Sequence, residues 1–282
     1  MKWKNIEEII FKIMMKLCLL VVLGSLMLII ATIAFKGLNA MNLDMITKTP
    51  RGGYYLGKEG GVLNAIVGSL FLTLASTAIA LVLSLPLVLY INIYRTKSRF
   101  TEVIRASLDF LWGIPSIVYG AFGFTVMIFM GIKASLLGGI IAVTLLMLPI
   151  MARAMDEAVS LVPRELVEAS YSLGATKFET SFKIVTRQSL SGIISAILIA
   201  AGRGIGDAAS VLFTAGFSDR VPLSLFEPAA TLPLAIFFQL GTPFPEVQER
   251  AYASAFILTI IILCLSIAAR LFASRFNRHI VK

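Results

Sequence analysis

The stretch PRELVEASYSLGATKFETSFKIVTRQ, residues 163–188, is a polar interruption between two long apolar runs. It predicts two short helices broken at Gly174, because glycine readily takes the left-handed conformation that ends a helix. Pro163 suits the first position of the first helix, and Thr176 with Glu179 has the spacing of a capping box that starts the second. Each helix carries one apolar face: Leu166, Ala169 and Leu173 on the first, and Phe178, Phe182 and Val185 on the second. We interpret the segment as a compact unit built to be held by a partner.

The chain as a whole is strongly apolar: 58% of its 282 residues are hydrophobic, 15% are charged, and the mean hydropathy is +0.89. This composition excludes an ordinary soluble globular domain. Six runs approach or exceed the roughly 20 apolar residues that cross a bilayer core: 13–35, 63–94, 112–130, 134–152, 189–213 and 251–273. The first is too long for the apolar part of a cleavable signal peptide. We therefore expect an all-α polytopic membrane protein with six transmembrane helices.

The basic residues are divided unevenly between the two sides of these runs, which predicts the orientation. The N-terminus, the second and fourth loops and the C-terminal tail hold 17 of the 25 Lys and Arg residues, whereas the other three loops hold 7, and Arg203 lies inside a run. Both termini and residues 163–188 are therefore expected on the cytoplasmic side of the membrane. The net charge of +9 follows from this topology, so it does not indicate nucleic-acid binding.

The residue types needed for common catalytic and metal sites are scarce in the sequence. Cys18 and Cys264 both fall in apolar runs, and His279 is the only histidine, so neither a zinc site nor a Ser-His-Asp triad can be assembled. The chain contains no GxxxxGK[ST] motif and thus no P-loop of its own. We expect no enzyme activity, no cofactor and no metal in this chain, and any ATP must be bound by partner subunits.

Charged residues inside the fifth run bear on the substrate. Arg203 and Asp207 stand four residues apart, and Ser210 and Thr214 continue the same face of a helix. An arginine at the centre of a membrane helix costs about 2.5–3.5 kcal/mol on insertion scales, so it usually faces protein or water. One interpretation is a translocation path for a tetrahedral oxyanion, whose oxygens match the guanidinium fork. The other is a buried Arg203–Asp207 pair that only fixes helix packing.

Other features of the runs leave alternatives open. Arg153, near the end of the fourth run, is a second candidate for the anion path or a simple positive-inside anchor. Gly202 and Gly206 form a pair of small residues that lets membrane helices approach closely. Pro115 and Pro149 predict kinks in the third and fourth runs.

Residues 216–249 are interrupted by five prolines, Pro222, Pro228, Pro233, Pro243 and Pro245. Within this segment, residues 232–240 are apolar enough to predict a short, half-buried helix. Irregular backbone at membrane depth is tolerated only where protein or a water-filled cavity surrounds it. We interpret the segment as a gate or docking element on the outer side.

Within residues 163–188, Glu168-Ala169 followed by Gly174-Ala175 resembles the EAA loop of prokaryotic ABC importer permeases, with Ser170 in place of the commonest alanine. The resemblance implies the type I ABC importer permease fold. It also implies that the segment forms a pair of cytoplasmic coupling helices that dock into an ATPase subunit. An ordinary cytoplasmic loop between two spans is the alternative.

Four further motifs together resemble the PstA-type permeases of phosphate ABC importers: GIPSIVYG at 113–120, GRGIGD at 202–207, LFTAG at 212–216 and SLFEP at 224–228. That family usually has glutamate where this chain has Asp207. The resemblance runs from about Gly60 to the C-terminus and implies a permease core over 61–282 with coupling helices at about 163–188. Before it, the first apolar run and a polar segment predict a first transmembrane helix and an outer loop over residues 1–60. The resemblance also implies three kinds of partner besides membrane lipid: a PstC-type second permease, a dimer of PstB-type ATPase subunits and a PstS-type extracytoplasmic phosphate-binding protein.

Two other classes of function stay open at this point. One is a permease of the same superfamily that moves sulfate, molybdate or tungstate. The joint presence of the four motifs argues against this alternative. The other is a non-transport membrane protein, either an assembly scaffold or an intramembrane enzyme. A scaffold does not need the helix pair of residues 163–188, and an enzyme needs a nucleophile and a base that the sequence does not offer.

Overall fold

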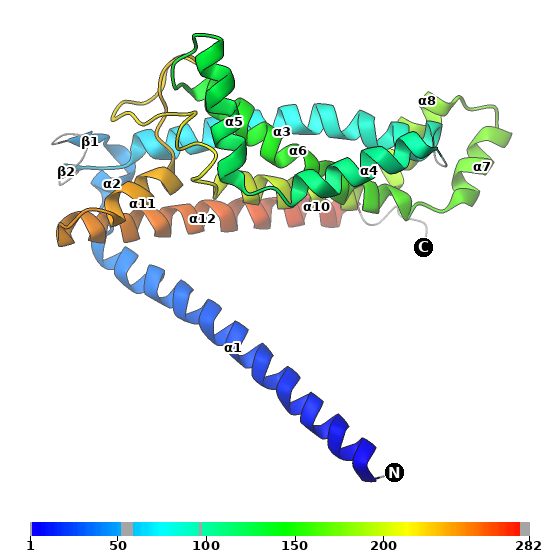
Figure 1. Cartoon of the computed structure of the whole chain (residues 1–282), viewed down its shortest axis with the longest axis horizontal. Coiled ribbons are helices and arrows are strands. Elements are labelled where there is room, and N and C mark those ends of the chain that lie inside the picture. Colours follow the sequence, from blue (N-terminus) through cyan, green and yellow to red (C-terminus); the bar gives the residue numbers. More distant parts are fainter. Residues whose placement is uncertain (1, 52–58, 96–97, 277–282) are drawn as a thin grey trace.

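The computed structural model describes residues 2–51, 59–95 and 98–276, so His279 lies outside the described residues. Four helices lie side by side along the long axis of the molecule (Figure 1): α3 (Leu63–Leu89), α6 (Leu136–Ser160), α10 (Leu190–Ile205) and α12 (Pro245–Phe276). A small two-stranded sheet marks one end of this bundle, and residues 163–188 mark the other (Figure 1). We call these the sheet end and the hairpin end.

Among the described residues, four helices are long and apolar enough to cross a membrane, and two bent helix pairs raise this number to six if each pair is one span. The four helices are Glu7–Ala40, Leu63–Tyr94, Leu136–Ser160 and Pro245–Leu271. They confirm the predicted runs 13–35, 63–94, 134–152 and 251–273. The second of them consists of α3 and a π-helix, η1 (Tyr90–Tyr94). The chain is thus an all-helical, multi-pass membrane protein.

Helix α6 forms the centre of the bundle because it is apolar on most of its faces. Val143, Met147 and Met151 are completely buried in a core that α6 shares with α3 and α10. The hydroxyl group of Ser76 on α3 donates a hydrogen bond to the carbonyl oxygen of Ile140 at 3.1 Å. Small polar side chains of this kind join helices where lipid supplies no hydrophobic driving force. Pro149 lies inside α6 without ending it.

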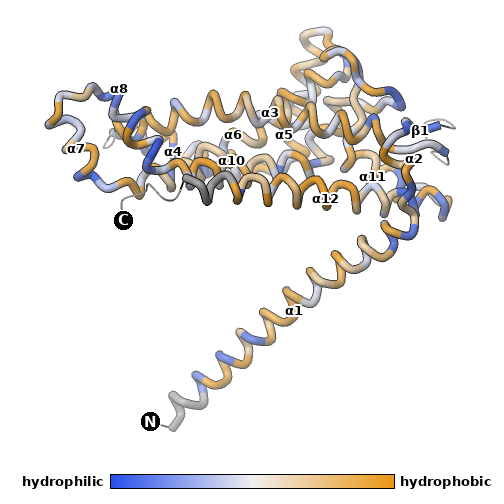
Figure 2. The backbone as a smooth tube through the Cα atoms, turned by 180° about the vertical axis from the view of Figure 1, so that it is seen from behind, coloured by the Kyte–Doolittle hydropathy of each residue, from blue (hydrophilic) through white to orange (hydrophobic). Residues whose placement is uncertain are grey.

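Helix α1 (Lys2–Ala40) diverges from the bundle and touches it only near its C-terminal end (Figure 1). There, a β-carbon on Gly37 would lie 2.6 Å from the β-carbon of Phe256, so glycine permits the close approach to α12. The ammonium group of Lys36 lies 4.6 Å from the ring centroid of Tyr252. The rest of α1 is largely apolar (Figure 2) and exposed, as expected for a helix in lipid.

The predicted third run, 112–130, holds a single helix, α5 (Ser116–Phe129), but its predicted start is wrong. A helix that was not predicted, α4 (Arg99–Trp112), comes before it, and the two meet at an angle of 99° across residues 113–115, which we call the elbow. The kink predicted at Pro115 is thus a complete break, and Pro115 stands at the N-cap of α5. Helix α5 has 14 residues and spans only about 21 Å, which is less than the roughly 30 Å of a bilayer core. The sequence did not predict α4, because a segment with four charged residues between apolar runs is typical of a loop.

The predicted fifth run, 189–213, is also wrong as a continuous helix, because α10 ends at Ile205. Two glycines in its last turn, at 202 and 204, lower the helix propensity by roughly 1 kcal/mol each, and Gly206 follows as the C-cap. Residues 206–231 then form an irregular segment, which we call the buried coil, before α11 (Leu232–Leu240) begins. Most residues near its two ends, 207–215 and 229–231, are buried or half-buried among the helices, whereas residues 223–228 between them are exposed. The bounds and half-burial of α11 confirm the short helix predicted at 232–240.

Glycines on the surrounding helices make room for the buried coil. A β-carbon on Gly68 of α3 would lie 2.0 Å from the carbonyl oxygen of Ala230, and one on Gly120 of α5 would lie 2.9 Å from that of Ser210. Close approach of backbone to helix therefore requires glycine at these positions. The coil also accepts hydrogen bonds from the first N–H groups of α6, which lack partners within their own helix: Ser135 and Leu136 donate to the carbonyl oxygens of Thr214 and Glu227 at 2.9 and 2.8 Å.

At the sheet end, the chain before α3 folds into a small cap. It consists of α2 (Leu43–Thr47) and the antiparallel strands β1 (Pro50–Arg51) and β2 (Glu59–Gly60). Met45 is buried in a second apolar core with residues of α3, α11 and α12. The segment predicted only as an outer loop therefore has a structure of its own.

Candidate functional site

Arg203 lies in a small cavity of about 240 Å³ on the side of the bundle. Six apolar residues from α4, the elbow, α6 and α10 complete its walls: Leu111, Trp112, Ile114, Leu146, Ile150 and Ile199. Arg203 is the only charged residue in the lining, and it is exposed. The cavity therefore presents a single guanidinium group among apolar side chains, on a face that no other part of the described chain covers.

The polar stripe predicted along one helix, from Arg203 to Thr214, is not formed, because α10 ends before Asp207. Asp207 is only 8% exposed, and its carboxylate accepts a hydrogen bond from the backbone N–H of Ser210 at 2.8 Å. Thr214, which is buried, donates from its hydroxyl group to the carbonyl oxygen of Ser210 at 2.8 Å. In the part of the chain that the structure describes, no ion pair joins Arg203 to Asp207. Asp207 instead caps the first turn of the buried coil.

The close helix approach predicted at Gly202 and Gly206 occurs within this chain at Gly204, which lies between them. A β-carbon on Gly204 would lie 2.6 Å from the sulfur of Met147, whereas one on Gly202 would meet no atom within 4 Å. Gly204 is therefore the packing glycine of α10. Gly202 lies on the exposed face beside Arg203, where it leaves room for another chain.

Arg153, the second candidate for the anion path, is held by carboxylates on two helices. Its Nε lies 2.9 Å from Oδ1 of Asp109 on α4, and its Nη1 lies 3.2 Å from Oδ2 of Asp156 on α6. The side chain of Asp156 is 3% exposed, and its Oδ2 also lies 2.8 Å from Nε of Arg105 on α4. Asn92 of η1 donates to the same carboxylate at 2.7 Å. Sequence reasoning missed the roles of Arg105, Asp109 and Asp156. The available signal was the opposite charges just before the third apolar run and just after the fourth.

The segment 163–188 folds into the predicted pair of helices, which we call the helical hairpin (Figure 1). Its elements are α7 (Arg164–Ser172), α8 (Lys177–Glu179), a π-helix η2 (Thr180–Val185) and α9 (Thr186–Gln188). Gly174 has a φ of +82°, which confirms its left-handed conformation. The N–H groups of Gly174 and Ala175 donate to the carbonyl oxygens of Tyr171 and Ser170 at 2.9 and 3.1 Å, which is the Schellman pattern. Pro163 stands at the N-cap, one residue earlier than predicted.

The second helix of the hairpin begins with the predicted capping box. The N–H of Glu179 donates to the hydroxyl oxygen of Thr176 at 3.2 Å, and the N–H of Thr176 donates to the Glu179 carboxylate at 3.1 Å. That backbone N–H, together with the ammonium group of Lys183 at 3.0 Å, lowers the pKa of Glu179 to about 2. Across the hairpin, the hydroxyl groups of Ser170 and Thr180 lie 2.9 Å apart and join the two helices.

The far surface of the hairpin is exposed and apolar. Leu173 is 89% exposed and Phe178 is 63% exposed. Of the residues expected to contact an ATPase subunit, Glu168, Ala169 and Gly174 are exposed and Ala175 is half-buried. Exposed apolar side chains on a polar segment outside the apolar bundle are typical of a protein interaction site.

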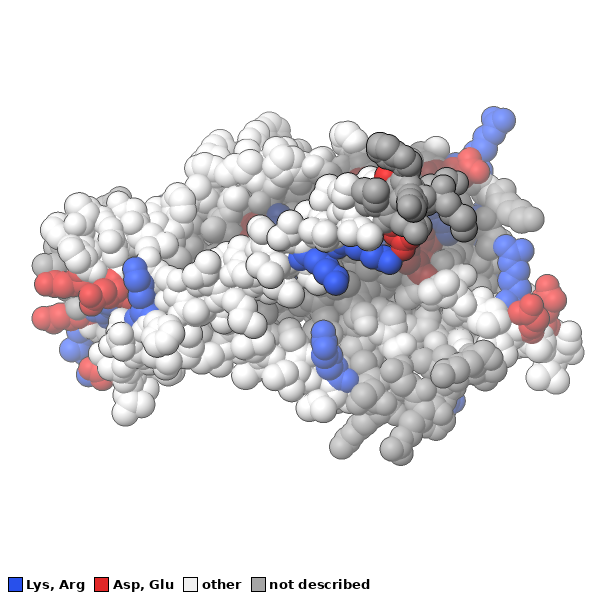
Figure 3. Space-filling view, turned by 90° about the horizontal axis from the view of Figure 1, so that it is seen from below, with Lys and Arg blue, Asp and Glu red and all other residues white. Residues whose placement is uncertain are grey.

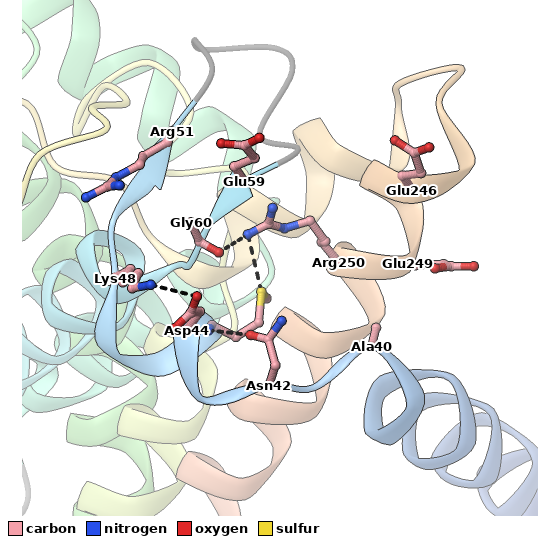
Figure 4. Close-up of a pocket in the computed structure, with 11 residues that line it drawn as sticks. Ala40, Asn42, Asp44, Lys48, Arg51, Glu59, Gly60, Glu246, Glu249 and Arg250 are labelled. Atoms are coloured by element: carbon pink, nitrogen blue, oxygen red, sulfur yellow. Dashed lines mark hydrogen bonds and ion pairs between the residues drawn. The ribbon is translucent and has the colours of Figure 1, made fainter.

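A second pocket, of about 450 Å³, lies at the sheet end between the cap and α12 (Figure 4). Arg250 of α12 reaches across it and donates to the carbonyl oxygen of Gly60 (Figure 4). Its other lining residues include carboxylates and bases of both elements, among them Asp44, Lys48 and Glu249. Sequence reasoning gave no role to this region. Arg250 joins the cap to the bundle, and the charges around it suit a surface in water.

Charged side chains gather at both ends of the molecule, and a few also lie over the middle of the face that Figure 3 shows. This distribution agrees with a protein whose ends reach water on opposite sides of a membrane. Among the residues that the structure describes, no group of three or more His, Cys, Asp or Glu side chains could hold a metal ion.

Comparison with known proteins defines the class. The family model of the binding-protein-dependent transport system inner membrane component matches residues 84–282. The chain belongs to this family of membrane permease components. Family membership favours a transport role over the scaffold and enzyme alternatives.

Relatives narrow this class further. The chain is 34% identical to the phosphate transport system permease protein PstA of Haemophilus influenzae, over 86% of each protein. It is 37% identical to the PstA protein of Yersinia pestis, over 83% of this chain and 79% of that protein. Within the family the chain thus belongs with the PstA-type permeases, as its motifs predicted.

A solved structure supports the fold. A chain of the inward-facing MetNI methionine ABC transporter superimposes with a TM-score of 0.63 and 18% identity, over 76% of this chain and 95% of that chain. At this identity the likeness shows the fold alone, which is that of an ABC importer permease.

Proposed function

We propose that this chain is one permease subunit of an ATP-driven importer of inorganic phosphate. The observation that carries the proposal is the Arg203 cavity, in which one guanidinium group stands alone among apolar walls. A guanidinium group binds two oxygens of a tetrahedral oxyanion at once, and an intramembrane arginine without a carboxylate partner is available to such a ligand. The names of the PstA relatives specify phosphate as that oxyanion.

The open side of the cavity implies a second permease. Arg203 and Gly202 both lie on an exposed face, and an arginine that faced lipid there would cost about 2.5–3.5 kcal/mol. A PstC-type chain packed on this face would cover the guanidinium group and complete the path. In this proposal, Asp207 holds the buried coil beside the path, and Ser210 and Thr214 form part of that coil.

The helical hairpin provides the docking site for the ATPase subunits that drive transport. Its exposed apolar residues fit a cleft on a PstB-type ATPase subunit, and a dimer of such subunits binds and hydrolyses the ATP. This role places the hairpin end in the cytoplasm together with both termini, in agreement with the basic residues. A PstS-type binding protein would then deliver phosphate at the sheet end.

Uptake by the complete complex tests the proposal. We would reconstitute this chain with its three kinds of partner in proteoliposomes and measure ATP-dependent uptake of phosphate, sulfate, molybdate and tungstate. We expect uptake of phosphate alone, and Arg203→Gln should lower it at least tenfold while the yield of complex is unchanged. Arg203→Lys keeps the positive charge but loses the planar pair of guanidinium donors. Its phosphate uptake should lie between that of the unaltered complex and that of the Arg203→Gln complex.

Two outcomes would contradict the proposal in different ways. A preference for another anion would assign the same path to a different oxyanion, which is the second candidate function. Full phosphate uptake by the Arg203→Gln complex would remove Arg203 from the path.

A further inference from the structure

Four charged side chains join α4 to α6 on the hairpin side of the Arg203 cavity. Arg105 of α4 lies 2.8 Å from Asp156 of α6, and Asp109 of α4 lies 2.9 Å from Arg153 of α6. The later residue of one helix pairs with the earlier residue of the other, so the two helices run in opposite directions. We call these two contacts the inner rung, Arg105–Asp156, and the outer rung, Arg153–Asp109.

The two rungs differ in how firmly they are held. In the inner rung, the carboxylate of Asp156 accepts Nε and Nη2 of Arg105 at 2.8 and 2.9 Å and Nδ2 of Asn92 at 2.7 Å. Its side chain is 3% exposed, whereas that of Asp109 in the outer rung is 52% exposed. Arg105 is itself 34% exposed and Arg153 26% exposed, so the difference lies in the carboxylates. A buried carboxylate that loses its partners is left uncompensated, whereas a pair with an exposed carboxylate contributes at most about 1 kcal/mol. The outer rung can therefore open while the inner rung stays closed.

The outer rung lies next to the walls of the Arg203 cavity. On α4, Asp109 precedes the lining residue Trp112 by three positions, and on α6, Arg153 follows the lining residue Ile150 by three positions. Each partner is thus within one helical turn of the cavity. Separation of the outer rung would move the end of α4 and the elbow, which together form one wall of the cavity.

The inner rung lies next to the hairpin. Arg105 and Asn92 line a further cavity of about 400 Å³, whose opposite wall includes Glu168 and Tyr171 of α7. Ion pairs lead from Arg105 through Asp156 and Arg153 to Asp109, and the hairpin shares the cavity at the start of this series. A shift of the hairpin that closes or opens this cavity would act on Arg105 first and, through the ion pairs, on the wall of the Arg203 cavity.

We propose that the outer rung is a release latch for the cargo. When the outer rung is closed, it holds α4 and the elbow beside Arg203. It then blocks the path from the Arg203 cavity to the hairpin end. Movement of the hairpin, transmitted through the inner rung, opens the outer rung and connects the cavity to the hairpin side. The direction of release and the anionic cargo rest on the proposed function, whereas the latch itself rests on the geometry of α4 and α6.

A crosslink tests whether the rung must open. We would replace Cys18 and Cys264 with serine, introduce Asp109→Cys with Arg153→Cys, and treat the reconstituted complex with a short bifunctional thiol reagent that is cleaved by reductant. We expect crosslinking to lower phosphate uptake at least tenfold and reduction to restore it, with the ATPase subunits attached throughout. Each single cysteine treated in the same way is the control. Undiminished uptake by the crosslinked complex would overturn the latch.

A second measurement does not depend on the cargo. Ile150→Cys, at a cavity position that is 5% exposed, reports access from the hairpin side to a water-soluble thiol reagent. Without ATP, Asp109→Asn should raise its labelling rate severalfold, because the outer rung is lost. Glu157→Gln is the matched control, since Glu157 lies 3.9 Å from the same guanidinium group and bridges no second helix.

These results separate the two proposals. Unchanged labelling in the Asp109→Asn variant would contradict the latch even if phosphate is carried. Failure of the unaltered complex to carry phosphate, with increased labelling in Asp109→Asn, would contradict the cargo and leave the latch in place.

Discussion

The helical hairpin and the buried coil are near neighbours in sequence but find their hydrogen-bond partners at very different distances along the chain. In the hairpin, Ala175 donates to Ser170, and Thr176 exchanges hydrogen bonds with Glu179. In the coil, the carbonyl oxygen of Thr214 accepts from Ser135. The hairpin is therefore stabilised by local motifs, and the coil by the helices around it. Changes within the hairpin should have local effects, whereas changes around the coil should affect the whole bundle.

The largest expected effect is that of Gly68→Val, which tests the dependence of the coil on its surroundings. The new side chain would begin 2.0 Å from the carbonyl oxygen of Ala230, and overpacking of this kind costs about 1–3 kcal/mol or more. We expect little monodisperse protein in size-exclusion chromatography and a much lower melting temperature. Gly24→Val in α1, where nothing lies within 4 Å, is the control and should behave as the unaltered protein. Equal stability of the two variants would show that the coil can shift to accommodate the larger side chain at little cost.

The next effect is that of Gly174→Val in the hairpin. A β-branched residue in the left-handed conformation costs about 1–2 kcal/mol, so the second helix should be misaligned while the bundle remains intact. We expect a normal yield of the permease, together with weaker retention of ATPase subunits on an affinity column. Gly174→Asn, which tolerates the left-handed conformation, should restore retention. Loss of the folded permease in Gly174→Val would contradict the local character of the hairpin.

Asp207→Ala should have a smaller effect on the coil. It removes the acceptor for the N–H of Ser210, which is buried, and loss of a comparable cap costs about 0.5–2 kcal/mol. A melting temperature a few degrees lower is expected, measured on the purified complex. Asp207→Asn keeps an acceptor oxygen and should retain both stability and uptake. Abolished uptake in Asp207→Asn at normal stability would instead show that the charge of Asp207 acts in the path.

The smallest effect is expected for Thr176→Ala, which removes one half of the exposed capping box. Peptide and protein caps of this type contribute about 1 kcal/mol. Because the Schellman contacts of Gly174 and Ala175 remain, the hairpin should fray only at the start of α8. Hydrogen exchange should accelerate at Lys177 to Glu179 and nowhere else, and Thr176→Ser should preserve protection. Faster exchange throughout α10 would show that the hairpin and the span are one cooperative unit.

Much of the fold follows from the sequence because its signals are local or strictly periodic. Long apolar runs predicted α1, α3, α6 and α12, and an apolar stretch between prolines predicted α11 at its observed bounds. Gly174 and the Thr176–Glu179 pair predicted the hairpin, since a left-handed glycine and a capping box need only neighbouring residues. Of the candidate path, the sequence alone indicated Arg203, because an arginine within an apolar run is rare and costly.

Only the tertiary structure decided how the chain breaks and which charges meet. The course of the buried coil after α10 depends on helices with glycine at positions 68 and 120, which admit its backbone, and these lie far away in sequence. The pairing of Arg153 with Asp109 depends on the packing of α4 beside α6. Local sequence cannot specify either feature, because the energy of a buried backbone segment or ion pair depends on partners that folding brings together.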